Sequence, residues 1–276
     1  MPTPCPLCPR RCPDRAAGLC GETDFTHARV AKTMLHRWEE PCVSGGRGTG
    51  AVFFAGCNMR CVFCQNHEIS QTRPLPGEPV DAARLAEIFW QLQAQGAESI
   101  SLISPTHVLP VARDAMRLAK EQGFPLRFIW NSNAYELPGV LWSLEGLVDL
   151  YLPDLKFADN CLALYCSGTP GYFRRAAQAI PEMRRQGEVL IRHMVLPGGR
   201  KDSMRVLDWI AANAPGARVS LLAQYTPMHR AAEFPPMHRR VTGFEYDSVA
   251  DYALSLGLKG YFQAREAATA EYTPIF

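Results

Sequence analysis

A strand-like apolar run leads directly into three cysteines in the stretch GAVFFAGCNMRCVFC, residues 50–64. Cys57, Cys61 and Cys64 follow a C-x3-C-x2-C spacing. Three thiolates on one short loop can ligate three corners of a cubic [4Fe–4S] cluster, whereas an electron-transfer cluster normally takes four cysteine ligands. The spacing therefore predicts a cluster in which one iron is open to a further ligand. The alternatives are part of a zinc site and three unrelated buried thiols.

The composition indicates one sizeable globular domain with a small appendage, since 47% of the 276 residues are hydrophobic and 20% are charged. The 29 basic and 27 acidic residues give a formal net charge of +2, which argues against general nucleic-acid binding. The sequence shows no signal-peptide pattern and no run of about 20 apolar residues that could span a membrane. We therefore expect a cytoplasmic protein whose ten cysteines serve metal binding or redox chemistry rather than disulfides.

Six short apolar runs alternate with helical patterns from residue 50 onward. Each run is nearly continuous in apolar residues, as expected for parallel strands covered on both faces. Such strand–helix units predict an α/β fold with right-handed crossovers and with its chemistry at the carboxyl ends of the strands. Periodicity alone leaves open whether the sheet closes into a barrel. The expected strands are residues 50–55, 100–104, 126–131, 148–153, 189–195 and 218–223.

The chain divides into three expected regions. Residues 1–47 form a small cysteine-rich segment, residues 48–264 the α/β core, and residues 265–276 a tail. The glycine-rich residues 42–50 connect the first region to the second.

The cysteine spacing, with the aromatic Phe63 directly before Cys64, resembles the signature of the radical S-adenosylmethionine (SAM) superfamily. The resemblance implies that Cys57, Cys61 and Cys64 hold the cluster and that its open iron chelates the amino and carboxylate groups of SAM. It implies that one electron from the cluster cleaves SAM to methionine and a 5′-deoxyadenosyl radical. It also favours a partial (β/α)6 TIM-like barrel as the form of the α/β fold.

Polar residues end the second and third expected strands, and we interpret them as contacts to SAM. After the second strand, many members of the superfamily carry Gly-Gly-Glu-Pro where this chain has a different sequence, and Pro105 should hold Ser104 in an extended conformation. After the third strand, short polar side chains can reach the ribose or carboxylate of SAM. Ordinary turns and helix caps are the alternative. The candidates are Ser104, Pro105, Thr106, Asn131, Ser132 and Asn133.

Charged residues mark the fourth and fifth expected strands. Asp154 and Lys156 lie two positions apart, so an extended chain places them on the same side. They can bind the zwitterionic methionine part of SAM, with a surface ion pair as the alternative. His193 is a candidate for the SAM carboxylate, although a hydrogen-bonded core histidine is the commoner arrangement.

Five further segments carry a narrower resemblance, to the pyruvate formate-lyase activating enzyme group and its branch with an N-terminal cysteine segment. Enzymes of this group take a hydrogen atom from a backbone glycine of a large partner enzyme. The resemblance thus implies a glycyl radical enzyme as the partner, and the chemistry implies an electron donor such as a flavodoxin. The segments are residues 38–42, 52–57, 104–107, 154–156 and 192–193.

A second set of cysteines lies near the N-terminus at Cys5, Cys8, Cys12 and Cys20. Four thiolates within sixteen residues can surround a tetrahedral zinc ion or hold an auxiliary iron–sulfur cluster. The segment has few apolar residues, so we expect it to need a bound metal ion or cluster in order to fold. Structural zinc is the first interpretation, an auxiliary cluster the second and free thiols the third.

These patterns together predict a radical SAM oxidoreductase that abstracts hydrogen, with a glycyl radical enzyme as the favoured target. A radical SAM enzyme that modifies a peptide or a small metabolite is the alternative. A non-enzymatic iron–sulfur electron carrier or zinc-binding module is a further alternative. Such a module would need a fourth ligand for the first cluster. It would not need the polar residues at the strand ends that we interpret as contacts to SAM.

Overall fold

A nine-stranded sheet forms the core of the computed structural model, which describes residues 4–16 and 18–263 of the chain. The strand order is β3-β1-β2-β4-β5-β6-β7-β8-β9. Neighbours from β2 to β9 are parallel, whereas β1 pairs antiparallel with both β2 and β3. The strands are β1 (Ala28–His36), β2 (Thr49–Phe54), β3 (Glu78–Val80), β4 (Ser99–Ile103), β5 (Arg127–Ser132), β6 (Leu150–Pro153), β7 (Glu188–Met194), β8 (Arg218–Leu222) and β9 (Gly260–Phe262).

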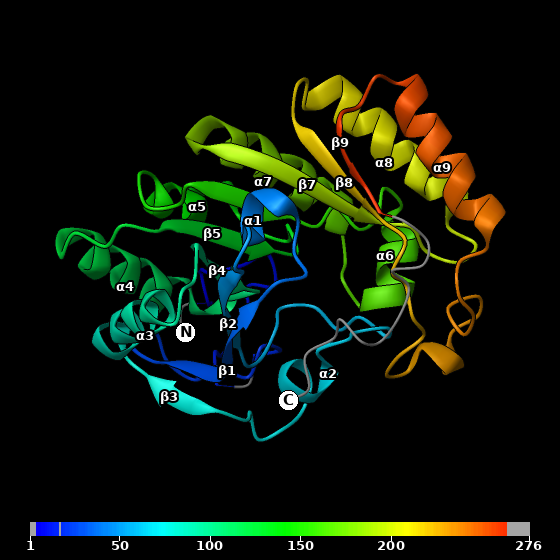
Figure 1. Cartoon of the computed structure of the whole chain (residues 1–276). Helices are drawn as coiled ribbons and strands as arrows, with labels where there is room; N and C mark the ends of the chain where they lie inside the picture. The colour runs from blue at the N-terminus through cyan, green and yellow to red at the C-terminus, as the bar shows by residue number, and fades with distance from the viewer. Residues whose placement is uncertain (1–3, 17, 264–276) are drawn as a thin grey trace.

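The predicted α/β architecture is confirmed. The six expected strands are β2 and β4 to β8, with ends displaced by at most two residues. The sheet curves around a concave face, and in the described part of the chain its edge strands β3 and β9 do not pair with each other, so the barrel is partial (Figure 1). β1, β3 and β9 were not predicted, and β1 makes part of the expected segment 1–47 integral to the sheet. The expected tail 265–276 lies outside the described residues.

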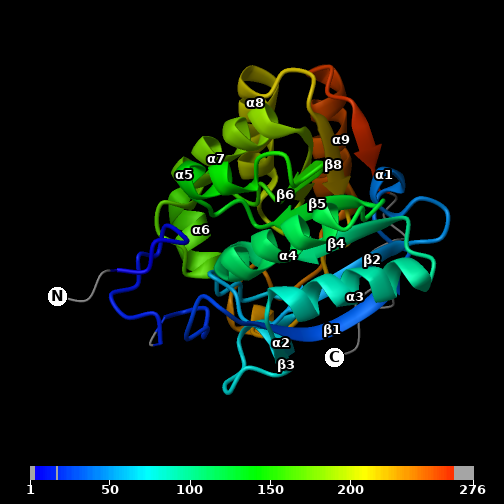
Figure 2. The same cartoon turned by 90° about the vertical axis from the view of Figure 1, so that its left-hand side faces the viewer.

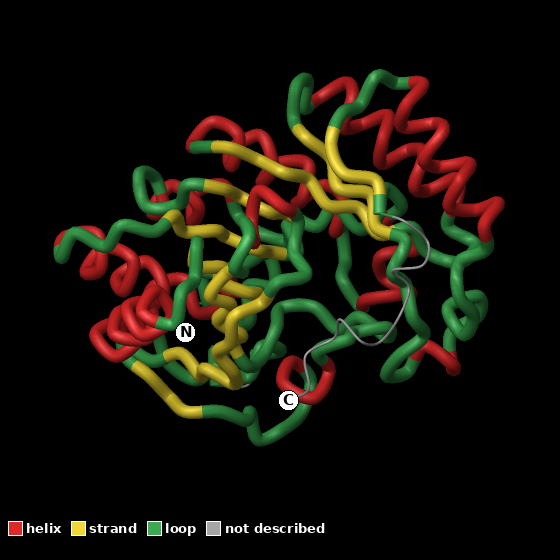
Figure 3. The backbone as a smooth tube through the Cα atoms, viewed as in Figure 1, coloured by secondary structure: helices red, strands yellow, loops and turns green. Residues whose placement is uncertain are grey.

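The long helices α3, α4, α7, α8 and α9 cover the convex face of the sheet (Figures 1, 2 and 3). No helix in the described ranges is long and apolar enough to cross a membrane. The α-helices are α1 (Pro41–Ser44), α2 (His67–Ser70), α3 (Ala82–Ala94), α4 (Leu109–Glu121), α5 (Pro138–Leu141), α6 (Asn160–Ser167), α7 (Tyr172–Gln186), α8 (Arg200–Asn213) and α9 (Gly243–Ser255). Three short 3-10 helices are η1 (Pro105–Val108), η2 (Trp142–Leu144) and η3 (Ala231–Glu233).

Side-chain caps define where several helices begin. The Asp81 carboxylate accepts the Arg84 N–H at 2.8 Å and begins α3. At α9, the Thr242 hydroxyl accepts the Glu245 N–H while the Glu245 carboxylate accepts the Thr242 N–H, which is a capping box. These caps satisfy amide donors that the first turn of a helix leaves without partners.

The short helix α1 fills the concave face near the amino ends of the parallel strands. Val43 packs there in a cluster with Ile129, Leu150, Leu152 and Leu190. Because α1 occupies this end, the cavity of the concave face lies toward the carboxyl ends of the strands. That is the end at which parallel α/β proteins place their active sites.

Strand alternation decides which side chains reach that open end. On β7, the apolar Leu190 lies in the α1 cluster, so residues two and four positions later, Arg192 and Met194, face the same side. On β5 and beyond β6 the same register turns Asn131 and Asp154 inward. Apolar residues thus occupy the closed end of the concave face, and polar residues occupy its open end.

Candidate active site

A cavity of about 240 Å³ lies at the carboxyl ends of the parallel strands. Its walls come from the cysteine loop after β2, from the ends of β4 to β8, and from His36, Trp38 and Glu39 at the end of β1 and just after it. The structure brings nine of the predicted site residues to this cavity. They are Cys57, Cys61, Phe63, Cys64, Ser104, Asn131, Asn133, Asp154 and Lys156.

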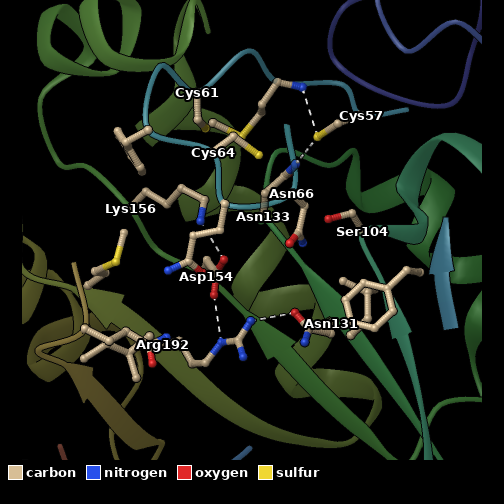
Figure 4. A pocket seen from close by; sticks show the side chains of 18 of the residues that line it. Cys57, Cys61, Cys64, Asn66, Ser104, Asn131, Asn133, Asp154, Lys156 and Arg192 are labelled. Atoms are coloured by element: carbon tan, nitrogen blue, oxygen red, sulfur yellow. Dashed lines mark hydrogen bonds and ion pairs between the residues drawn. The ribbon is translucent and has the colours of Figure 1, made fainter. Parts of the chain in front are cut away.

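The three cysteines lie along one side of the cavity (Figure 4). The Cys57 sulfur accepts hydrogen bonds from the Met59 N–H at 3.4 Å and from Asn133 Nδ2 at 3.6 Å. Burial raises the pKa of the Cys57 and Cys61 thiols, so both stay protonated without a metal. Coordination to a metal deprotonates such a thiol outright. Three partly buried thiols that line one cavity, one of them already a hydrogen-bond acceptor, fit the ligand set of a cluster.

The backbone of the cysteine loop is held by segments far away in the sequence. The Arg60 N–H donates to the Ser167 carbonyl at 3.0 Å, and the Val62 N–H donates to the Cys166 carbonyl at 2.9 Å. Both acceptors belong to α6. The Phe63 ring meets Tyr225 edge to face, with 5.7 Å between their centroids. These contacts hold the backbone of the loop against α6 and Tyr225.

A network of charged side chains lies opposite the cysteines (Figure 4). Asp154 is at its centre, with Oδ2 at 2.6 Å from Lys156 Nζ and Oδ1 at 2.8 Å from Arg192 Nε. Arg192 also donates to Glu39 Oε2 at 2.9 Å and to Asn131 Oδ1 at 2.6 Å. The expected alignment of Asp154 with Lys156 is confirmed, and their charges lie in the cavity rather than on the outer surface.

Mutual attraction keeps the central groups charged. Burial alone would raise the pKa of Asp154, but the positive charges of Arg192 and Lys156 hold it below its ordinary value. Burial likewise opposes the charge of Lys156, yet neighbouring Asp154 raises its pKa. Glu39 differs, because burial and the nearby carboxylates Glu40 and Asp154 raise its pKa to about 7 against the pull of Arg192.

Ser104 lines the cavity in a conformation that the sequence did not predict. Its φ of 55° and ψ of 50° are left-handed rather than extended. Its N–H donates to the Asn131 carbonyl at 2.8 Å, and Pro105 then begins η1 directly. With this conformation Ser104 alone turns the chain from the end of β4 into η1, which an extended residue would not do.

Three expected SAM contacts do not line the cavity. Thr106 and Ser132 instead hydrogen-bond the buried carboxylate of Glu136, at 2.9 and 2.8 Å. Trp130 Nε1 donates to the same carboxylate at 2.9 Å. Ser132 follows Asn131 in the strand and therefore faces the opposite side, and Pro105 is buried in η1. The expectation for Pro105, Thr106 and Ser132 is thus corrected to a supporting position behind the cavity wall.

His193 is also placed away from the cavity. Its Nδ1 lies 2.7 Å from the Leu155 carbonyl and its Nε2 lies 2.9 Å from Ser203 Oγ. The ring is buried, and burial lowers its pKa to about 4. Since Arg192 faces the cavity, its neighbour in the strand must face the helices. The expected contact to the SAM carboxylate is corrected to a core histidine.

Arg192 and Glu39 are cavity residues that the sequence analysis did not assign to the site. The sequence does carry a signal for Arg192. It is an arginine within an apolar strand, and it lies on the same side of that strand as Leu190 and Met194, which indicates that it points into the concave face. Glu39 has no such signal. It reaches Arg192 from the other end of the chain, across 153 residues of sequence.

The four N-terminal cysteines also lie together. Cys5, Cys8, Cys12 and Cys20 line a second cavity of about 10 Å³. Burial, with a smaller contribution from the neighbouring thiols, raises the pKa of Cys8 to about 11. Among the described residues, no three histidine, cysteine or acidic side chains already have the arrangement of a single-ion site, at either set of cysteines. The N-terminal metal therefore stays a prediction.

Comparisons with known proteins agree with the geometry. The sequence model of the radical SAM superfamily matches residues 51–210. The uncharacterized protein MJ0674 of Methanocaldococcus jannaschii is 29% identical over 261 residues, which cover 90% of this chain and 74% of that protein.

Solved structures show the same fold. SuiB of Streptococcus suis, bound to S-adenosylmethionine, matches with a TM-score of 0.54 and 16% identity over 78% of this chain and 50% of SuiB. SuiB bound to its precursor peptide SuiA matches with a TM-score of 0.54, 14% identity, and coverage of 76% of this chain and 47% of SuiB. The chain thus spans about half the length of SuiB. With the family match over more than half of its residues, the chain belongs to the radical SAM superfamily.

Proposed function

We propose that this radical SAM enzyme binds SAM in the larger cavity, cleaves it reductively and takes a hydrogen atom from a segment of a partner protein. The observation that carries the proposal is the position of the three cysteines opposite the network of Asp154 and Arg192 across one cavity (Figure 4). A glycyl radical enzyme is the favoured partner. A peptide or a small metabolite is the alternative substrate.

Cys57, Cys61 and Cys64 would hold the [4Fe–4S] cluster, and within the described residues no fourth cysteine lines the cavity. When bound, the cluster supplies the electron for the cleavage of SAM. The cavity residues would position SAM for this chemistry. Lys156 and Arg192 offer positive charge to the carboxylate of its methionine part, and Asp154 offers an acceptor to its amino group.

Apolar side chains complete the lining of the cavity, and bound SAM together with its substrate would exclude water from it. Phe53, Ile103, Met194 and Leu222 are among the residues that line it. A dry site strengthens the electrostatic interactions inside it. It also protects a reactive carbon radical from side reactions with anything but the intended substrate.

The rim of the cavity favours a macromolecular substrate. A volume of about 240 Å³ is already below the roughly 300–1,000 Å³ usual for a ligand of drug size, so SAM alone would occupy the cavity and leave no space for a second small molecule. A substrate group would therefore enter from outside. Trp38 lines the cavity while 64% of its surface is exposed, which is how a residue that contacts a partner segment would lie. SuiB, which has a similar fold, binds a precursor peptide.

The production of 5′-deoxyadenosine tests the reaction. Anaerobically reconstituted, chemically reduced protein is mixed with SAM, and the nucleoside is measured by chromatography. We expect the Cys61→Ala variant to lose this product, while Cys161→Ala, which alters an exposed cysteine outside both cavities, retains it. Normal cleavage by Cys61→Ala would refute the cluster assignment, and no cleavage by the wild type would refute the function.

Deuterium transfer tests the substrate. A candidate glycyl radical enzyme is produced with glycine deuterated at the α-carbon and added to the reaction. Transfer of deuterium into 5′-deoxyadenosine supports the favoured partner. If SAM is cleaved but no deuterium is transferred from any glycyl radical enzyme, the alternative of a peptide or metabolite substrate is supported.

A further inference from the structure

Four arginines gather around the cavity of the N-terminal cysteines. In the described ranges, none of them forms an ion pair with a carboxylate. Their hydrogen-bond acceptors are carbonyl oxygens, one hydroxyl and one thiol, all neutral groups. The four are Arg10, Arg15, Arg60 and Arg73.

Within the described part of the chain, Arg15 is the clearest case of a positive charge without a carboxylate bound to it. Only 9% of its surface is exposed, and it donates to the Asp24 carbonyl at 2.7 Å, the Cys5 sulfur at 3.5 Å and the His107 carbonyl at 3.0 Å. The nearby carboxylate of Glu22 accepts the Arg29 N–H and attracts Arg15 only at longer range, without forming an ion pair with it. A buried guanidinium whose hydrogen-bond acceptors are all neutral is unfavourable, because buried charges are normally paired directly.

Arg60 and Arg73 add to the positive charge. Both donate to the Leu19 carbonyl, next to Cys20, and the Arg73 bond is 2.6 Å long. Two guanidinium groups on one carbonyl repel each other. An anionic group at the cysteines would relieve this repulsion and would pair the charge of Arg15 as well.

We propose that Cys5, Cys8, Cys12 and Cys20 bind a thiophilic metal centre as an anionic tetrathiolate and that the surrounding arginines neutralise its charge. Each thiol releases its proton to solvent as it binds the metal. Four thiolates with a divalent zinc ion carry a formal charge of about −2, as they do with an oxidised [4Fe–4S] core. Either centre supplies the anion that the arginines lack.

The arginines also connect this centre to the cysteine loop of the larger cavity. Arg60 donates to the Cys57 and Met59 carbonyls at 3.2 and 3.1 Å, in addition to Leu19. Arg10 donates to the Asn58 carbonyl at 2.9 Å. Binding of the N-terminal metal therefore fixes the far side of the loop that carries the first cluster ligand.

Metal analysis of the anaerobically purified protein tests the site. We expect Cys12→Ser to lose either one zinc or about four irons per chain relative to the wild type, which also identifies the centre. The matched control Cys161→Ser should keep the full content. An unchanged metal content in folded Cys12→Ser would overturn the proposal. The measurement needs no SAM, so a negative result leaves the function of the larger cavity untouched.

Arg15→Gln tests the neutralising charge with all four cysteines in place. Loss of an outer partner typically weakens metal binding about 10–100-fold, which competition with a chelator measures. The control is Arg184→Gln, since Arg184 also donates only to carbonyls, those of Asn213 and Pro215, but on another part of the molecule. Equal metal retention by the two variants would refute the role of the arginines.

Hydrogen exchange tests the connection. In metal-depleted Cys12→Ser, the amides of residues 56–64 should exchange several-fold faster than in Cys161→Ser. Loss of the metal without any change in exchange at this loop would show that the two sites are independent.

Discussion

The Arg192 guanidinium lies 2.8 Å from Asp154, and the same two residues share an isolated parallel backbone bridge beyond the end of β6. The bridge keeps the register of the β6–β7 ladder, in which Leu150 pairs with Glu188. The ion pair thus holds two strands together where their regular pairing has ended. Both residues line the cavity, so the pair also forms part of its wall.

Asp154→Asn should destabilise the protein. It leaves Arg192 and Lys156 without their shared carboxylate. We expect a loss of about 3 kcal/mol in the free energy of unfolding, at the lower end for a broken buried pair because both partners keep some exposure. Urea unfolding of the cluster-free protein measures it. Asp114→Asn, in an exposed pair, should change stability by less than about 1 kcal/mol, and equal effects would contradict the role of the network.

Glu136→Ala should be at least as damaging, although Glu136 does not line the cavity. It removes the acceptor of Thr106, Trp130 and Ser132 together. An unsatisfied buried donor costs about 1–3 kcal/mol, so thermal unfolding should shift clearly. Glu121→Ala, at the exposed end of α4, should be within about 0.5 kcal/mol of the wild type. A small effect at both positions would mean that water replaces the carboxylate.

Gly56→Ala should separate the N-terminal segment from the cysteine loop. Gly56 has a φ of 84°, and an added Cβ would lie 2.3 Å from the Cys20 carbonyl oxygen. Gly123→Ala is the control, because its φ of 79° brings the same backbone strain with nothing within 4 Å of the new Cβ. Limited proteolysis before residue 28 should be faster in Gly56→Ala alone. Equal rates would show that strain, rather than contact, governs this junction.

The stability of the protein should fall as the pH decreases from about 6.5 to 4. Burial lowers the pKa of His193 to about 4, below the ordinary value of 6.5, so the unfolded chain binds a proton first. His193 therefore contributes a slope of up to about 1.4 kcal/mol per pH unit in this window, and none above or below it. His193→Asn should reduce the slope with which the free energy of unfolding, measured in urea, changes with pH. His238→Asn, which alters an exposed histidine, should leave that slope unchanged. An unchanged slope in His193→Asn would contradict the buried neutral ring.

Trp38→Ala should separate SAM cleavage from substrate turnover. The variant substitutes no cluster ligand and none of the charged side chains around Asp154, so we expect 5′-deoxyadenosine still to form without the partner. Hydrogen transfer from the partner should decrease by at least tenfold if Trp38 is a binding hot spot. Truncation of such a residue to alanine usually costs about 2 kcal/mol or more of binding free energy. Trp142→Ala, equally exposed at 62% but outside the cavity, should leave transfer unchanged. Equal transfer by the two variants would remove Trp38 from the partner surface.

The parallel strands were predictable because each is buried on both faces and so is apolar throughout. β1 was not predictable in this way. It is an antiparallel strand, and polar residues such as Lys32 and Thr33 interrupt its apolar ones. β3 and β9 have three residues each, too few for any periodicity to be visible.

The site was predictable where chemistry and spacing are local. The cysteines share one loop, and Asp154 with Lys156 needs only the alternation of an extended chain. The partners of Arg192 and Glu136 could not be found in this way, because they depend on which strands become neighbours. The alternation rule alone would have excluded Ser132 once Asn131 was placed in the cavity.

Ser104 has a further consequence for the cavity wall. Its left-handed backbone is one that glycine adopts freely and that a residue with a Cβ adopts at about 1–2 kcal/mol. The turn is thus less stable than the same turn would be with glycine. Unlike glycine, Ser104 places one hydroxyl group on the cavity surface. The backbone sets the shape of this wall, and the hydroxyl is the polar group that the Ser104 side chain offers to a bound ligand.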